Sequence, residues 1–188
     1  MKNAVRSIGP VVAALLLGIG CNKQGGSGSV PTTKETVESS VAGITWSYPT
    51  RWVKQGPRAM RAATYTVAGS GSEQSGECAV FFFGSGQGGD VGMNIDRWAG
   101  QFQDAKSSDR TTKTVSGLKI TMVTIEGTYL SPSGPMMQSA GAIPGYKLLG
   151  AIVEAPQGMV FYKLTAPASV ANAAAAEFQA MLDSVTRI

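Results

Sequence analysis

Residues 146–165, YKLLGAIVEAPQGMVFYKLT, decide the fold. Two apolar runs, 146–155 and 159–165, flank the turn sequence Pro156-Gln157-Gly158, and this arrangement predicts a β-hairpin. A tight hairpin joins antiparallel strands and cannot join parallel ones. Both runs are apolar on either face, so we expect these strands to lie in the middle of a sheet that is covered on both sides.

Outward from this hairpin, short apolar runs separated by Gly, Ser and Pro predict further strands. A second hairpin is predicted at Ser116-Gly117, between runs 112–115 and 118–129. The earlier predicted strands cover residues 44–48, 61–67 and 78–83. Cys78 falls within the last of these runs and is expected to be a buried, inert thiol.

Two amphipathic helices are predicted. Val91, Ile95, Trp98 and Phe102 recur at helical spacing, which predicts a helix over 90–103 with Asp90 as its N-cap. Residues 169–185 carry a second apolar face and predict a helix at the end of the domain. We therefore expect an α+β fold, a mainly antiparallel sheet with helices packed on it, in a single domain over 41–188.

The N-terminus has the pattern of an export signal. Lys2 and Arg6 form a positive segment, and residues 8–20 are uncharged and mostly apolar. This apolar segment is shorter than the roughly 20 residues that a membrane-spanning helix needs, and it fits a signal peptide. Removal of the two cations changes the net charge from 16 − 12 = +4 to 14 − 12 = +2, which gives no basis for nucleic-acid binding.

The predicted signal peptide, residues 1–20, ends at Cys21. The sequence LGIGC over 17–21 resembles a bacterial lipobox, although Gly18 stands where the family usually has Leu. The resemblance implies that Cys21 becomes the mature N-terminus and carries diacylglycerol, with acyl groups such as palmitate; a plain secretory signal and an uncleaved anchor are the alternatives. Residues 21–40 are polar and predict a flexible tether that reaches about 25 Å. We expect a lipid-anchored protein of the bacterial cell envelope, in the outer membrane or on the outer face of the inner membrane.

A family resemblance rests on two segments. Residues 48–52, YPTRW, resemble the YPxxW segment that opens PsbP/Mog1-like domains, and residues 160–167 with the following helix resemble the last strand and helix of that class. The stretch from Phe83 to Trp98 also resembles uncharacterised bacterial lipoproteins. The class implies an α/β/α sandwich that docks onto a protein partner, and it implies no catalytic residues.

A glycine-rich stretch precedes the first predicted helix. Gly84, Gly86 and Gly89 match G-x-G-x-x-G, with Gly88 between them. Such glycines can expose backbone N–H groups to a phosphate at a helix N-terminus. The context favours a tight strand-to-helix turn, because hairpins follow and Asp90 would repel an anion. A small anionic ligand held by the turn at 84–90 is the alternative.

The function expected is that of a non-enzymatic binding or assembly module for an unknown envelope protein. The chain has no histidine and only two cysteines, and no paired carboxylates stand out, so we expect no catalytic residues, metal or cofactor. Residues 131–145 are predicted to be a long loop whose Gly and Pro residues keep it out of the sheet. Met136 and Met137 in this loop are the predicted partner contact.

Overall fold

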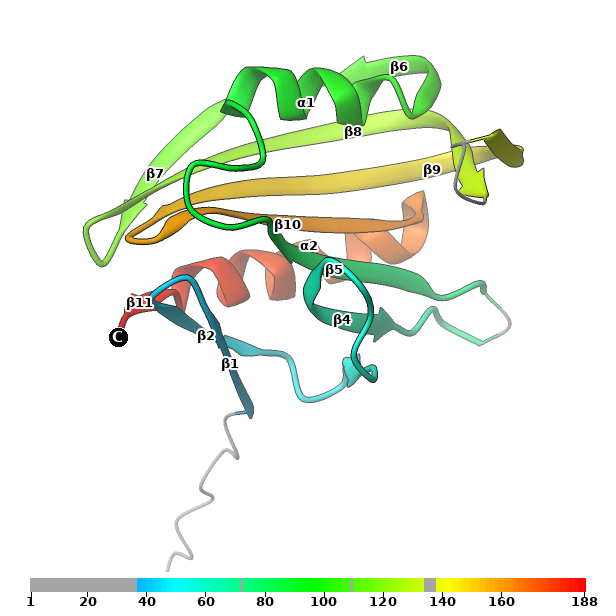
Figure 1. The fold of residues 1–188 in the computed structure, drawn as a ribbon. Helices are drawn as coiled ribbons and strands as arrows, with labels where there is room; N and C mark the ends of the chain where they lie inside the picture. The colour runs from blue at the N-terminus through cyan, green and yellow to red at the C-terminus, as the bar shows by residue number, and fades with distance from the viewer. Residues whose placement is uncertain (1–36, 72, 109, 134–137) are drawn as a thin grey trace, which may run out of the picture. The chain divides into compact units, whose positions relative to one another are not determined.

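The computed structural model describes residues 37–71, 73–108, 110–133 and 138–188, which fold into two sheets and two helices (Figure 1). The strands are β1 (Val37–Val41), β2 (Ile44–Tyr48), β3 (Val53–Lys54), β4 (Arg61–Val67), β5 (Gly76–Phe82), β6 (Phe102–Ser107), β7 (Thr111–Val115), β8 (Leu118–Ser133), β9 (Gln138–Ala155), β10 (Gly158–Pro167) and β11 (Thr186–Arg187). The helices are α1 (Val91–Ala99) and α2 (Ala168–Asp183). Neither helix is long and apolar enough to cross a membrane.

The main sheet has eight strands, and every paired neighbour in it is antiparallel. Its order is β3-β4-β5-β10-β9-β8-β6, and β7 pairs with β8 as well. The predicted hairpin of β9 and β10 lies at its centre, where Val160 is opposite Val153. The predicted α+β class with a mainly antiparallel sheet is confirmed.

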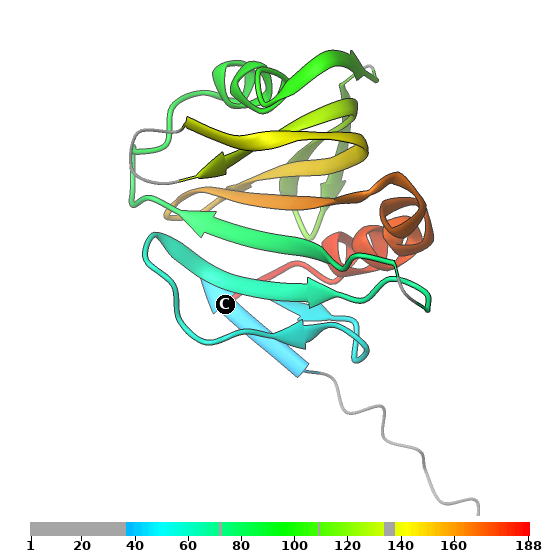
Figure 2. The same cartoon turned by 90° about the vertical axis from the view of Figure 1, so that its right-hand side faces the viewer.

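A helix lies against each face of the main sheet. On β10 the side chains alternate: Phe161 packs in one core with α1, and its neighbours Val160 and Tyr162 pack in the other core with α2. Helix α1 lies near β6 and β8, whereas α2 lies near β9 and β10 (Figures 1 and 2). The continuous apolar character of the central strands therefore reflects burial on both faces.

A second, three-stranded sheet has the order β1-β2-β11. The β1–β2 hairpin turns at Ala42 and Gly43, whose φ angles of 55° and 76° fit the positive-φ turns of tight hairpins. Strand β1 begins at Val37, so its first residues lie within the segment predicted to be the tether, 21–40. The mixed polar sequence of β1 gave no apolar alternation by which to predict a strand.

The YPTRW segment connects the small sheet to α2. The indole N–H of Trp52 donates to one Glu177 carboxylate oxygen at 2.9 Å, and Arg51 forms an ion pair with the other. Trp52 itself is only 2% exposed. The segment thus fixes the start of the domain against the last helix.

The first helix is shorter than predicted. It ends at Ala99, where the Gly100 N–H bonds to the carbonyl of Asp96, and Phe102 already belongs to β6. Phe102 is buried, but as a strand residue, so its helical spacing from Trp98 was coincidental. The predicted range of 90–103 is wrong at its C-terminal end.

The predicted loop over 131–145 is also wrong for its described residues. Ser131–Ser133 continue β8, and residues 138–145 are part of β9. The Gly and Pro residues are accommodated because the register shifts twice, between Gly127 and Tyr129 and between Ser131 and Pro132. Such bulges are positions at which sheets tolerate Gly and Pro.

Candidate functional site

The glycine-rich turn connects β5 to α1 through left-handed backbone. Gly84, Gly86, Gly88 and Gly89 have φ angles of 102°, 70°, 94° and 76°. The Gln87 N–H bonds to the carbonyl of Gly84 at 3.2 Å, which closes the turn. These conformations are costly for other residues, so the glycines have a structural reason to be there.

Gly88 is required for close packing as well. A Cβ atom at this position would lie 2.9 Å from Phe161 Cε2 and 3.1 Å from Phe83 Cδ2. Gly86, by contrast, has no atom within 4 Å of such a Cβ. The turn is therefore held tightly at Gly88 and is open at Gly86.

Asp90 caps helix α1, as predicted. Its carboxylate accepts a hydrogen bond from the Met93 N–H at 2.8 Å, and its carbonyl accepts from the backbone N–H of Asn94 at 3.2 Å. The carboxylate thus supplies negative charge at the helix N-terminus, where an anion would otherwise bind. Anion binding by the four glycines has no contact that supports it and stays a prediction.

Hydrogen bonds from the Asn94 side chain connect the turn to the helix. Its side-chain amide donates to the carbonyl of Gly88 at 2.6 Å and to that of Asp90 at 2.8 Å. Its side-chain oxygen accepts from Arg97. Asn94 is only 2% exposed, so one buried polar side chain fixes the turn, the helix start and an arginine.

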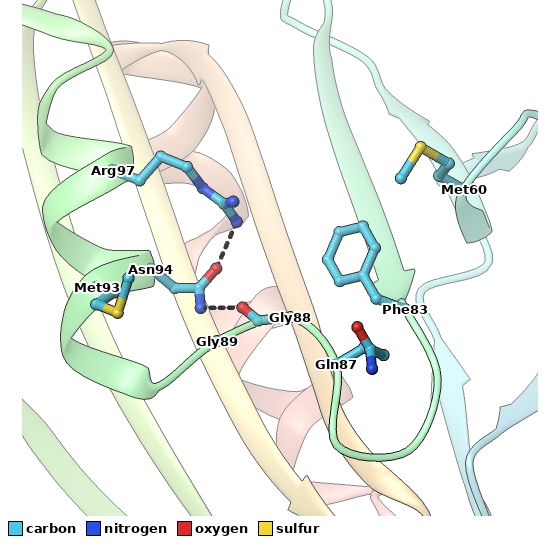
Figure 3. Close-up of a pocket in the computed structure, with 8 residues that line it drawn as sticks. All are labelled: Met60, Phe83, Gln87, Gly88, Gly89, Met93, Asn94 and Arg97. Carbon is cyan, nitrogen blue, oxygen red and sulfur yellow. Dashed lines mark hydrogen bonds between the residues drawn. The ribbon is translucent and has the colours of Figure 1, made fainter.

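A pocket of about 660 Å³ lies between this turn, helix α1 and the start of β4. Figure 3 shows Met93, Asn94 and Arg97 on the helix, with Phe83 and Met60 across from them. Gln87, Gly88 and Gly89 complete the lining. We call this site the Met60–Met93 pocket; its volume lies in the range typical of ligand-binding clefts.

The two methionines make the rim of this pocket unusually apolar. Met60 is 71% exposed and Met93 is 66% exposed. Among the described residues only Val53 and Ile188 are other large hydrophobic side chains with comparable exposure. The concentration of two flexible thioethers around one pocket is typical of an adaptable binding surface.

Arg97 brings a positive charge to the pocket. It is exposed and donates a hydrogen bond to Asn94, and no described carboxylate lies within salt-bridge distance of it. Most other described arginines are paired with carboxylates, as Arg110 is with Asp96 at 3.0 Å. The pocket therefore combines an apolar rim with a cation that has no carboxylate partner.

Met60 and Met93 were not predicted as contact residues. Met93 falls outside the apolar stripe of Val91, Ile95 and Trp98, and an apolar residue on the polar side of a helix was a usable signal. Met60 lies in the turn before β4 with a φ of 62°, and no sequence pattern relates it to Met93. The predicted contacts Met136 and Met137, and the predicted lipidation site Cys21, lie outside the described residues.

The described part of the chain holds no group of three His, Cys, Asp or Glu residues that could bind a metal ion. Cys78 is fully buried and has no disulfide partner, and burial raises its pKa strongly. A thiol in this state is a poor nucleophile. The predicted burial of this thiol is confirmed, and its inertness stays a prediction.

Comparison with known proteins shows a likeness of fold. No protein-family model and no curated protein matches the sequence. Among solved structures, cyanobacterial PsbP (CyanoP) from Synechocystis sp. PCC 6803 aligns with 87% of this chain and 98% of its own, at 10% identity and a TM-score of 0.54. The chain has a PsbP-like fold.

A second solved structure aligns less well with this PsbP-like domain. It is PA94 from Pseudomonas aeruginosa, described as a protein of unknown function and putative regulator. The alignment covers 79% of this chain and 94% of that one, with 10% identity and a TM-score of 0.48. The fold predicted from YPTRW and the last strand and helix is confirmed by the first of these comparisons.

Proposed function

We propose that this PsbP-like domain is a non-enzymatic binding module, anchored by lipid at Cys21 to the bacterial cell envelope. It holds an envelope protein through the Met60–Met93 pocket. The single observation that carries the proposal is the pairing of two exposed methionines, from segments far apart in the sequence, around one pocket. Exposed apolar groups gathered in one place lower the solubility of a domain unless a partner covers them.

The charge of the pocket defines the chemistry of the partner. Arg97 has no carboxylate partner in the described structure, and the walls at Phe83, Met60 and Met93 are apolar. A segment with a large apolar side chain next to Asp or Glu would fill the pocket and pair with the guanidinium. We therefore propose an acidic, apolar segment of a protein as the occupant.

A peptide selection tests this proposal. Random peptides displayed on phage are panned against the protein and against the Met60→Ser/Met93→Ser variant. We expect peptides in which an apolar residue neighbours Asp or Glu, and we expect them to lose about tenfold or more in affinity for the double variant and for Arg97→Ala. Val53→Ser, which removes an exposed apolar side chain elsewhere, is the matched control and should bind normally.

Methionine-methyl NMR then locates the bound peptide. Met60 and Met93 report on the pocket, and buried Met181 reports on the core. Peptide shifts confined to the two rim methyl groups support the proposal. Selected peptides that bind the double variant as well as the wild type, or that shift other methyl groups instead, would refute it.

A second candidate function is the binding of a small anion by the turn, and it is favoured by the guanidinium of Arg97, which has no carboxylate partner among the described residues. Titration with inorganic phosphate and with a nucleotide tests this candidate by calorimetry. Saturable binding that is lost in Arg97→Ala but unchanged in Met60→Ser/Met93→Ser would favour the anion over the peptide.

The proposed location has its own test. The charged segment, the short apolar run and Cys21 support a lipid anchor. In a bacterial host, Cys21→Ala should move the protein from the membrane fraction to the soluble fraction. An unchanged distribution would count against lipidation without bearing on the pocket.

A further inference from the structure

A second cavity lies on the α1 face of the main sheet, beyond the C-terminal end of that helix. Its volume is about 440 Å³. Five strands and the residue Gln101 after α1 contribute to its walls. Its charged side chains are Arg61, Glu77 and Lys163, and its aromatic side chains are Phe81, Tyr129 and Tyr146.

Lys163 stands in the middle of the sheet rather than at an edge. Its neighbours on β10, Tyr162 and Leu164, are fully buried on the α2 face, so the Lys163 side chain points to the opposite face. Across the ladder it faces Ala79 on β5 and Gly150 on β9. The small size of Ala79 leaves room beside the lysine.

Among the residues that the structure describes, the ammonium group of Lys163 has no anionic partner. It donates a hydrogen bond to the side-chain oxygen of Gln101 and lies 5.6 Å from the centre of the Tyr129 ring. No carboxylate of the described residues lies within 4.0 Å of it. A half-buried cation without a counter-ion is unfavourable, and an anion that entered the cavity would relieve this cost.

The one carboxylate that lines the cavity is already bound by two arginines. Glu77 accepts from Arg58 at 2.8 Å and from Arg61 at 2.7 Å. These three side chains and Lys163 together carry three positive charges and one negative charge. The local charge is therefore positive, and Glu77 is held by cations on its side of the cavity.

The rest of the wall suits a ring or an aliphatic body. The rings of Tyr129 and Tyr146 stack with their centres 5.7 Å apart, and Phe81 lines the same cavity. Tyr146 is oriented by its hydroxyl, which donates to Gln74 at 2.9 Å. Flat aromatic surfaces next to a cation match a molecule with one apolar and one anionic end.

We infer that this cavity binds a small organic carboxylate, with its carboxylate on the ammonium of Lys163 and its apolar body against Phe81, Tyr129 and Tyr146. The site is separate from the Met60–Met93 pocket, and the inference does not depend on the function proposed for that pocket. One half-buried ammonium favours a singly charged carboxylate over a phosphate, which would need more positive partners.

The titration of Lys163 agrees with this assignment. Its pKa is lowered to about 8, chiefly by burial and also by Arg61 and Arg97, against the opposing effect of Glu77. The hydroxyls of Tyr129 and Tyr146 face the same cavity and stay neutral in this range, because burial raises the pKa of both. Carboxylate binding should therefore weaken as the pH rises through about 8, where the ammonium loses its charge.

Titration with benzoate tests the inference. Calorimetry on the purified full chain should show saturable binding of benzoate at pH 7, and benzamide, its neutral analogue, should bind at least about tenfold more weakly. Lys163→Met should weaken benzoate binding by a similar factor, whereas Lys163→Arg should retain part of it. Lys119→Met, a strand lysine paired with Glu154 outside the cavity, should leave it unchanged.

Three results would overturn the inference. One is the absence of saturable benzoate binding to a folded wild-type protein. Another is equal affinity for benzoate in the wild type and Lys163→Met, with folding of the variant verified by circular dichroism. The third is Lys163-dependent binding of inorganic phosphate without binding of benzoate, which would make the site one for inorganic anions. None of these results bears on the selection of peptides at the Met60–Met93 pocket.

Discussion

The side-chain amide of Asn94 donates a hydrogen bond to the main-chain carbonyl of Gly88 at 2.6 Å, from inside helix α1 to the turn that precedes it. The same side chain bonds to the carbonyl of Asp90, and its oxygen accepts from Arg97. The shape of the Met60–Met93 pocket depends on this contact, because Gly88 forms one wall and Arg97 lies opposite. Asn94 is thus a positioning residue for the proposed site.

Asn94→Ala should lower the free energy of unfolding by about 1–3 kcal/mol, because it removes the hydrogen bonds of a buried side chain to the carbonyls of Gly88 and Asp90. Chemical denaturation measures the loss. The matched control is Asn172→Ala, at an exposed asparagine of α2, which should change stability by no more than about 0.5 kcal/mol. Equal stabilities of the two variants would show that the turn does not depend on Asn94.

Substitution of three glycines by alanine should separate backbone strain from packing. Gly56 has open space and no positive φ, Gly86 has open space with φ of 70°, and Gly88 has φ of 94° with Phe161 only 2.9 Å from a Cβ. We expect Gly56→Ala to leave the free energy of unfolding almost unchanged and Gly86→Ala to lower it by about 1 kcal/mol. Gly88→Ala should lower the free energy of unfolding by about 2–4 kcal/mol, because the added methyl group overpacks the site as well as straining the backbone. Thermal or urea denaturation that gave equal losses at 86 and 88 would contradict the packing argument.

The sequence was sufficient to predict the core strands, because their patterns and turns agree with each other. The predicted ranges 44–48 and 61–67 coincide with β2 and β4, and the turn at Ser116-Gly117 has the two positive φ angles, 51° and 73°, that its hairpin needs. Trp46 in the predicted strand 44–48 and Trp98 in the first predicted helix are both buried. Local sequence patterns were therefore enough to predict a strand wherever that strand carries its own apolar face.

Elements without such a face could not be predicted. Strand β6 has only Phe102 buried and is otherwise exposed, so its pairing with β8 left no period-2 signal in the sequence. The Met60–Met93 pocket was missed for a related reason, since its rim is assembled from a turn and a helix that meet only in the folded chain. In the sequence Lys163 likewise looks like an ordinary polar strand residue, and only the pairing of β10 with β5 places Ala79 beside it.

Cys78 should not react with thiol reagents in the native protein. It is fully buried on β5, and burial raises its pKa well above the ordinary value, so almost no thiolate is available. We expect no reaction of Cys78 with Ellman's reagent at pH 8 under native conditions and its complete reaction in guanidinium chloride. The denatured protein also reports on Cys21, because one reactive thiol is expected if Cys21 carries lipid and two if it is free. In the Cys21→Ala variant, whose only thiol is Cys78, rapid native reaction would show that β5 opens readily.

Lys163 should make stability depend on pH in the alkaline range. Its pKa is about 8 in the folded protein and about 10.5 when unfolded, so between these values the unfolded chain binds more protons. The free energy of unfolding therefore rises with pH across this window because of Lys163. Cys78 and Tyr65 act in the opposite direction, since their pKa values are raised by folding, that of Tyr65 to about 12. A matched variant is needed to separate these contributions.

Lys163→Met supplies the comparison, because it removes the buried charge and keeps Cys78 and Tyr65. Below pH 8 the variant should be the more stable protein, since the wild type holds a cation that has lost part of its hydration. As the pH rises from about 8 to 10.5, the free energy of unfolding of the wild type should rise relative to that of the variant. The difference between the two proteins should therefore shrink. Urea denaturation of both proteins at several pH values measures this difference. A difference that stays constant with pH would mean that Lys163 keeps its ordinary pKa and is well solvated in the cavity.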